Sequence, residues 1–140
     1  FLLLLAFPLI LFSCKNQTSL SHGKTSEESI QVIAFGSCNH EYDAQPLWEP
    51  IISQKPDLWV WLGDNIYGDT DSMPLLKAKY DQQNANLDYQ KLKSIAPIIG
   101  TWDDHDYGKN DAGKEYPFRQ QSRDLMYDFL DIPQNSPLRE

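Results

Sequence analysis

Residues 57–69 read DLWVWLGDNIYGD, an apolar run that ends directly in a glycine and an acidic loop. Its first part, Asp57–Leu62, has no polar alternation, which is typical of a strand covered on both faces. Similar apolar runs precede and follow it at Ile30–Phe35 (IQVIAF) and Ile95–Trp102 (IAPIIGTW). We therefore predict three strands, each buried on both faces of a sheet.

Helical patterns separate the three predicted strands. Apolar residues recur with helical spacing in four segments, Ala44–Gln54, Met73–Lys79, Leu87–Lys93 and Arg119–Leu130. The polar triplet Gln82-Gln83-Asn84 predicts a break between the middle two helices. Alternation of strands with helices predicts an α/β fold built in layers.

The composition limits the class of protein. The chain has 140 residues, 41% of them hydrophobic, which suits one packed domain and excludes wholesale disorder. Its formal net charge of −8 argues against a general nucleic-acid binder, because such proteins need basic side chains to displace counterions from phosphates. The same charge argues against adhesion to an anionic membrane by electrostatics alone. Two cysteines cannot form a disulfide scaffold.

The first residues predict export from the cell. Residues 1–12 read FLLLLAFPLILF; they carry no charge and are too few for a membrane span, which needs about 20 apolar residues. The run resembles the apolar core of a secretory signal peptide, and its end with Ser13 and Cys14 resembles the lipobox of bacterial lipoproteins. We expect residues 1–13 to be a signal peptide and Cys14 to carry a lipid anchor to the cell envelope. An ordinary signal peptide with a chance cysteine is the alternative.

The next segment differs sharply in composition. Lys15–Ser29 contains one apolar residue, Leu20, so it cannot bury enough surface to offset the entropy of ordering. We predict a flexible tether over residues 14–29 and a folded domain over residues 30–140. Because the chain begins with Phe1 rather than Met, we expect it to be part of a longer protein.

Each predicted strand ends directly in a polar cluster. The first is followed by Cys38, the second by Gly63–Tyr67 (GDNIY), and the third by Asp103–Asp106 (DDHD). In open α/β sheets, ligands bind beyond the carboxyl ends of the strands. If the strands are parallel neighbours, the three clusters therefore meet at one edge of the sheet, which is the main functional signal in the sequence.

The second and third clusters and the loops after them are rich in acid. They hold seven aspartates and one amine: Asp64, Asp69, Asp71, Asp103, Asp104, Asp106 and Asp111, with Lys109. Carboxylates held together at this density repel each other unless cations lie between them. A solvated acidic surface is the alternative, although it explains less well why the acids directly follow buried strands.

The other side chains at these strand ends indicate more than one kind of metal. A thiolate from Cys38, a phenolate from Tyr67 and an imidazole from His105 suit a transition metal, whereas carboxylate oxygens suit calcium or magnesium. A site with both kinds can bridge two ions through one carboxylate and clamp a phosphate. Taken singly, Cys38 is read as a small buried hydrophobe, and Tyr67 and His105 as ordinary loop residues.

Three motifs together resemble the PhoD-like alkaline phosphatase family of metallophosphoesterases. They are FGSC at Phe35–Cys38, LGDNIYGD at Leu62–Asp69 and TWDDHDYGKND at Thr101–Asp111. The resemblance covers nearly all of residues 30–140. It implies an αββα sandwich, of which this chain would supply the N-terminal half, and hydrolysis of phosphate esters with iron and calcium as cofactors.

The resemblance also implies roles for individual residues. Cys38, Asp64 and Tyr67 would ligate the iron, and Asp64 would bridge to calcium, with Asp103 or Asp104 on the calcium side. His105 resembles the histidine of the asparagine–histidine motif in related phosphoesterases, and we expect it to act with Asp64 in catalysis. The resemblance implies that the family's further aspartate and histidine ligands would come after residue 140.

We therefore expect an exported, lipid-anchored phosphomonoesterase or phosphodiesterase that acts on a phosphate-ester substrate. The alternative is a non-catalytic surface lipoprotein that binds calcium or a phosphorylated ligand. The motifs do not choose between monoester and diester substrates.

Overall fold

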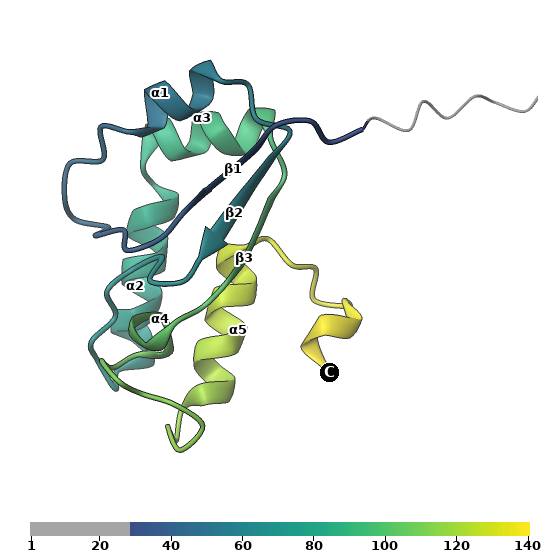
Figure 1. The fold of residues 1–140 in the computed structure, drawn as a ribbon. Helices are drawn as coiled ribbons and strands as arrows, with labels where there is room; N and C mark the ends of the chain where they lie inside the picture. The colour runs from purple at the N-terminus through teal and green to yellow at the C-terminus, as the bar shows by residue number, and fades with distance from the viewer. Residues whose placement is uncertain (1–28) are drawn as a thin grey trace, which may run out of the picture.

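The computed structural model describes residues 29–140 as a mixed α/β domain (Figure 1). The predicted signal peptide at residues 1–13, the anchor at Cys14 and the predicted tether up to residue 28 lie outside the described residues. The elements in chain order are β1 (Ile33–Gly36), α1 (Trp48–Ser53), β2 (Leu58–Leu62), α2 (Met73–Asn84), α3 (Leu87–Ile95), β3 (Ile98–Thr101), α4 (Asp104–Tyr107), α5 (Arg119–Phe129) and a 3₁₀ turn at Pro137–Arg139.

The three strands form one parallel sheet in the order β1-β2-β3. Phe35 lies opposite Val60, and Val60 lies opposite Ile99. The prediction of three strands in an α/β arrangement is confirmed. Strand β1 starts later than expected because the backbone N–H groups of residues 31 and 32 donate to the Asp57 carboxylate, at 2.8 and 2.9 Å, instead of entering the sheet.

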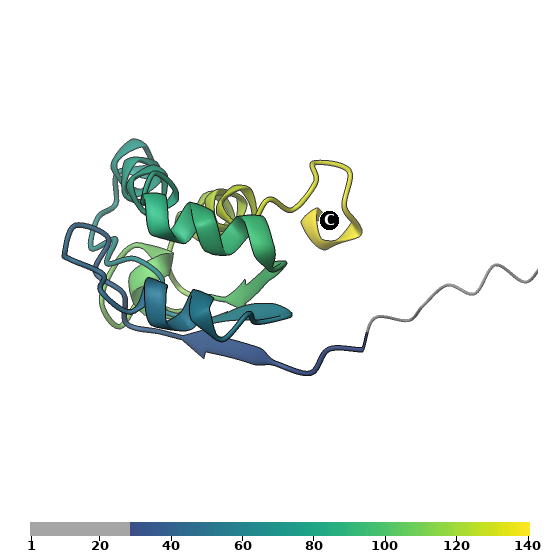
Figure 2. The ribbon, with the colours of Figure 1, turned by 90° about the horizontal axis from the view of Figure 1, so that it is seen from above.

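The helices cover one face of the sheet, as the view from above shows (Figure 2). On that face Trp59 and Trp61 are buried, and Trp61 packs against Tyr89 and Phe129 from the helices. These aromatic side chains are large apolar surfaces that contribute strongly to a core when they are removed from water.

The opposite face of the sheet is exposed, so the prediction that the strands are buried on both faces is wrong for the described residues. Because side chains alternate along a strand, the register places Ile33, Phe35, Leu62 and Ile99 together on this second face. Ile33 is 53% exposed and Phe35 is 66% exposed. Within residues 29–140, therefore, the strands are covered on one face only, and the second face is apolar and open.

Helices α1 and α2 differ most from their predicted bounds. Helix α1 begins only at Trp48, and Leu47 before it lacks a capping side chain. Helix α2 continues through Asn84, so the break between the two predicted helices falls at Ala85 and Asn86, just after the polar triplet. The reason is Gln83, which is completely buried and finds amide partners in the loop that precedes α1.

No helix in the described part of the chain is long and apolar enough to cross a membrane.

Candidate functional site

The loops that follow the three strands meet at one edge of the sheet. Asn39 N–H, after β1, donates to the carbonyl of Asp64, after β2, at 2.8 Å. Gly63 lies so close to the loop after β3 that a Cβ built on it would be 2.8 Å from Cβ of Asp103. Its φ of +99° is a conformation that strongly favours glycine. The parallel sheet thus brings the three predicted polar clusters together.

The side chains of Cys38 and Asp64 are in contact, and both residues have an uncommon backbone conformation. Both have left-handed conformations, with φ of 54° and 48°. Such conformations are uncommon outside glycine and occur often at functional sites. The Cys38 thiol donates to Asp64 Oδ2 at 3.8 Å. The other carboxylate oxygen, Oδ1, is buried and has no hydrogen-bond partner among the described residues.

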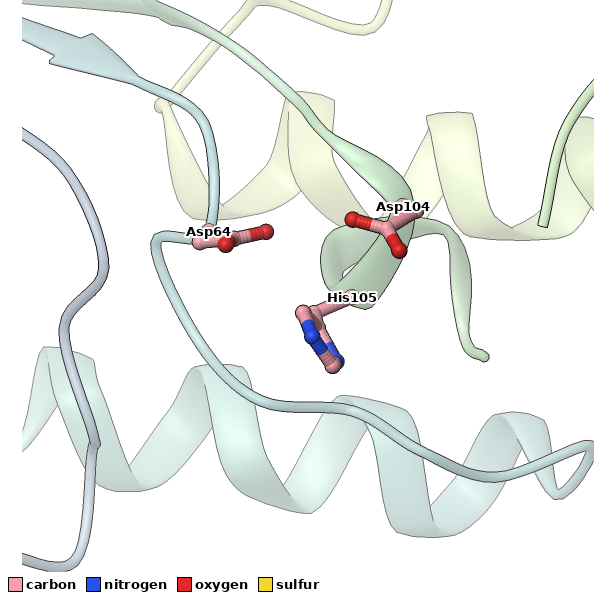
Figure 3. A group of neighbouring side chains, drawn as sticks. All are labelled: Asp64, Asp104 and His105. Atoms are coloured by element: carbon pink, nitrogen blue, oxygen red, sulfur yellow. The ribbon is translucent and has the colours of Figure 1, made fainter. Parts of the chain in front are cut away.

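Asp64, Asp104 and His105 form a group that could hold a metal ion (Figure 3). One ligand atom from each lies within 4.8 Å of the others. Asp64 comes from the loop after β2, and the other two come from the start of α4. Burial raises the pKa of Asp64, the charge of His105 opposes this, and the negative charges of Asp103 and Asp104 add to it. A cation at this position would relieve that repulsion.

Tyr67 completes the cluster on the side of Cys38. Burial, followed by the charges of Cys38 and Asp64 and a hydrogen bond with the Cys38 thiol, raises the pKa of Tyr67 to about 12. Its ring stacks on His40 with centroids 3.8 Å apart and lies 4.3 Å from the ring of His105. The sequence analysis did not single out His40, because nothing in the local pattern indicates that stacking.

His105 is fixed by an acid from another loop. Its Nδ1 lies 2.8 Å from Asp69 Oδ1. Burial lowers the pKa of His105, but the hydrogen bond to Asp69 and the charges of Asp69, Asp104 and Asp64 outweigh burial and raise it. Asp69 was counted only as one of the acids, and the structure shows that it orients the imidazole.

Helix α4 was not predicted, and it uses two of the acids for its own stability. The Asp103 carboxylate accepts from the N–H of Asp104, and Asp103 and Asp106 form a reciprocal capping box. The Asp103 side chain thus caps the helix, and the group of three ligand atoms described above does not include it. Asp104, the other predicted calcium ligand, faces Asp64, and its Oδ2 also accepts from the N–H of Asp111.

Asp106 ties the loop after β2 to α4. It is 1% exposed and accepts hydrogen bonds from the N–H groups of Asn65, Ile66 and Asp103 at 3.0, 3.3 and 3.1 Å. Burial raises its pKa to about 7, although these hydrogen bonds act in the opposite direction. Asp106 is thus a positioning residue for the loop that carries Asp64.

Asn65 belongs to the predicted polar cluster after β2, but no role was predicted for it. Its side chain is fully buried, and its amide group donates to the carbonyl of Thr101 at 2.9 Å. The amide oxygen has no partner among the described residues. Its location next to Asp64 was visible in the sequence, but its burial was not.

No protein-family model, curated protein or solved structure that was compared with the chain matches it. The fold and the side chains at the sheet edge therefore carry the functional argument. They define an α/β domain with a cluster of thiol, phenol, carboxylate and imidazole groups at the carboxyl edge of a parallel sheet.

Proposed function

We propose that the chain belongs to a metal-dependent phosphoesterase of the PhoD-like type. The observation that carries the proposal is the meeting of Cys38, Asp64 and Tyr67, with Asp64 Oδ1 buried and unpartnered. An unpaired buried oxygen is costly, so native structures rarely leave one without a reason. A bound cation is the reason that this proposal supplies.

The donor set fits the two expected metals. The thiol of Cys38 and the phenol of Tyr67 suit iron; the thiol lies 3.8 Å from Asp64 Oδ2, and the ring of Tyr67 lies 4.3 Å from the ring of His105. The oxygens of Asp64 and Asp104 suit calcium, and a ring nitrogen of His105 lies within 4.8 Å of an oxygen from each of these two carboxylates. When bound, these cations would neutralise charge on a phosphate and polarise its bonds to oxygen.

The protein side chains would do the remaining work. Asp64 would help to hold both cations. His105, oriented by Asp69, would contact the phosphate or its leaving oxygen and supply or accept a proton there. Asp103 and Asp106 would keep α4 and the Asp64 loop in place.

The open face of the sheet supports the finer fold proposal, an αββα sandwich. Its side chains are aliphatic or aromatic and form one contiguous apolar surface. Surfaces of this kind mark contact sites in soluble proteins. A second sheet packed on this face would give the sandwich its inner layer.

The test compares three variants by metal analysis and by hydrolysis of an aryl phosphate monoester and diester. Asp64→Asn keeps the side-chain volume but removes charge, so it should lose both metals and activity. His105→Ala should keep metal while turnover falls by roughly 10²–10⁴-fold. Asp81→Asn, exposed on α2, is the control and should behave as the parent does.

Two results would overturn the proposal. One is an Asp64→Asn protein that retains both metals and near-normal turnover. The other is a parent protein that binds calcium tightly but hydrolyses neither ester, which favours the non-catalytic lipoprotein. Visible absorption gives an independent readout, because an iron–phenolate site is coloured and Tyr67→Phe should bleach it.

We also propose that the protein is exported and anchored by lipid on Cys14, which lies outside the described residues. Stable anchoring takes two or more acyl chains, and the predicted tether has no apolar face to replace them. Cys14→Ser should therefore release the protein from membranes, whereas Cys38→Ser should not. Equal membrane fractions for both variants would contradict the anchor.

A further inference from the structure

Glu41, in the loop between β1 and α1, is a charged residue with a buried side chain. That side chain is 1% exposed, and its Oε1 pairs with Nζ of Lys79 from α2 at 3.1 Å. Taking two charges out of water is costly, and apolar residues of similar volume are often at least as stable in such a place. The ion pair therefore calls for a reason other than the stability of the fold.

The two side chains of this pair hold the backbone of Tyr67 from both sides. The N–H of Tyr67 donates to Glu41 Oε2 at 3.1 Å, and Lys79 Nζ donates to the carbonyl of Tyr67 at 2.6 Å. Tyr67 lies between β2 and α2, outside every helix and strand of the described chain. Hydrogen bonds to charged groups are stronger than those between neutral groups, so they fix the backbone here without the help of regular secondary structure.

The ring of Tyr67 is aligned by the residue next to Glu41. His40 stacks on this ring with centroids 3.8 Å apart and an angle of 16° between the planes. Two consecutive residues of the loop after β1 thus contact both the ring and the backbone of Tyr67. Helix α2 holds this loop at a second point, because Gln82 Nε2 donates to the carbonyl of Glu41 at 3.3 Å.

The phenol that is held in this way belongs to the candidate metal site. The ring of Tyr67 lies 4.3 Å from the ring of His105, a member of the metal-ligand group. A functional side chain has to stay within about 0.5 Å of its working position, and neighbouring residues have to supply that restraint. Contacts to both the backbone and the ring of Tyr67 supply it here.

We propose that Glu41 and Lys79 are positioning residues for Tyr67, whose phenol they keep in the place where it binds iron. The inference rests on the proposed function for the role of that phenol as an iron ligand. A purely structural ion pair, which only attaches α2 to the loop after β1, is the alternative that the experiments have to separate.

The first experiment follows the Tyr67 ring in the metal-free protein by NMR, with ¹³C-labelled tyrosine rings and the Tyr67 resonance assigned by its loss in Tyr67→Phe. Lys79→Met removes the amine that holds the Tyr67 carbonyl. Glu41→Gln combined with Lys79→Met removes the same amine without leaving a buried unpaired charge, so this double variant serves if the single variant unfolds. We expect the nuclear Overhauser effect between the rings of Tyr67 and His40 to weaken in both proteins.

Lys93→Met is the matched control. The Lys93 side chain is 15% exposed and pairs with Asp131 at 2.7 Å, so it is a second largely buried lysine in an ion pair. Its other polar partner is Asn84, at 3.3 Å, and neither partner belongs to the metal-ligand group. Lys93→Met should leave the effect between the two rings unchanged.

The second experiment adds iron(III) to the full-length protein and measures bound iron and visible absorption. The absorption arises from the bond between iron and phenolate, so it reports the place of the Tyr67 oxygen rather than the stability of the fold. In the double variant we expect the band to weaken and iron binding to fall by about tenfold, the equivalent of one or two hydrogen bonds. Lys93→Met should match the parent.

The outcomes separate this inference from the proposed function. An unchanged effect between the rings in the Lys79 variants, or an equal loss in Lys93→Met, overturns the positioning role. A parent-like iron band in a variant whose ring contact has weakened overturns it as well. A parent that gives no iron band, with a ring contact that weakens only in the Lys79 variants, supports the positioning of Tyr67 and overturns the proposed iron site.

Discussion

Gln83 connects helix α2 to the loop that carries Cys38 and His40. Its Oε1 accepts from Asn39 Nδ2 at 2.7 Å and from Gln45 Nε2 at 2.8 Å, and its Nε2 donates to Gln45 Oε1 at 3.1 Å. The side chain is completely buried. Replacing it with alanine removes three hydrogen bonds and leaves unfilled volume in the interior.

We predict that Gln83→Ala lowers the free energy of unfolding by about 2–4 kcal/mol, at roughly 1 kcal/mol for each hydrogen bond and a similar amount for the volume. The loss is limited because the partners keep other contacts. Asn39 Nδ2 still donates to the carbonyl of Asn65 at 3.1 Å, and Gln45 Nε2 still donates to the carbonyl of His40 at 3.3 Å.

The assay is equilibrium unfolding in urea, followed by tryptophan fluorescence. Gln83→Met retains most of the volume and separates packing from hydrogen bonding, so it should fall between the parent and Gln83→Ala. Gln121→Ala on α5 is the control, because that side chain is exposed and makes no hydrogen bond within residues 29–140; its effect should stay within about 0.5 kcal/mol. A Gln83→Ala protein as stable as this control would refute the reasoning.

Two further predictions concern the sheet. Gly100→Ala would place a Cβ 2.6 Å from Cβ of Trp61 in the neighbouring strand and should destabilise the protein by about 1–3 kcal/mol in urea unfolding. Gly113→Ala would meet only the carboxylate end of Glu115, at 3.1 Å, and should be nearly neutral. Hydrogen bonds from the backbone N–H groups of Val32 and residue 31 hold the pKa of Asp57 below its ordinary value of 3.8, so its stabilising effect is complete above pH 3.8 and is lost as the pH falls through the folded-state pKa. Unfolding measured from pH 5 to pH 2 should therefore show a shallower acid dependence for Asp57→Asn than for the parent, and identical slopes would contradict this account.

The strands and their meeting point were predictable because they depend on local composition. Runs without polar alternation identified β1, β2 and β3, and parallel order then required their carboxyl ends to lie together. The pattern could not show which faces are covered, since an apolar run reads the same whether one face is open or both are packed. The structure within residues 29–140 has one open face.

The helix break was misplaced because its position depends on partners distant in sequence, and the roles of several acids depend on local structure that the sequence pattern does not reveal. Gln83 indicated a break because glutamine is usually exposed, but amides about 40 residues away allow it to be buried. Asp103 and Asp106 were read with the metal-binding acids, although aspartates at a helix start also cap it, and sequence alone does not separate the two uses. Asp69 acquires its role only from the position of His105.

The left-handed backbone at Cys38 and Asp64 lowers the stability of the fold in order to keep two side chains of the metal-binding cluster. Glycine would relieve the steric cost at either position, so a selection for thermal resistance alone should enrich Cys38→Gly and Asp64→Gly. Both replacements delete a side chain of the metal-binding cluster, whereas Lys55, with φ of 51° and no part in that cluster, offers the same relief at no functional loss. Engineering for heat tolerance can therefore begin at Lys55. A side chain kept at Cys38 and Asp64, where glycine would be more stable, indicates that these two positions serve function rather than stability.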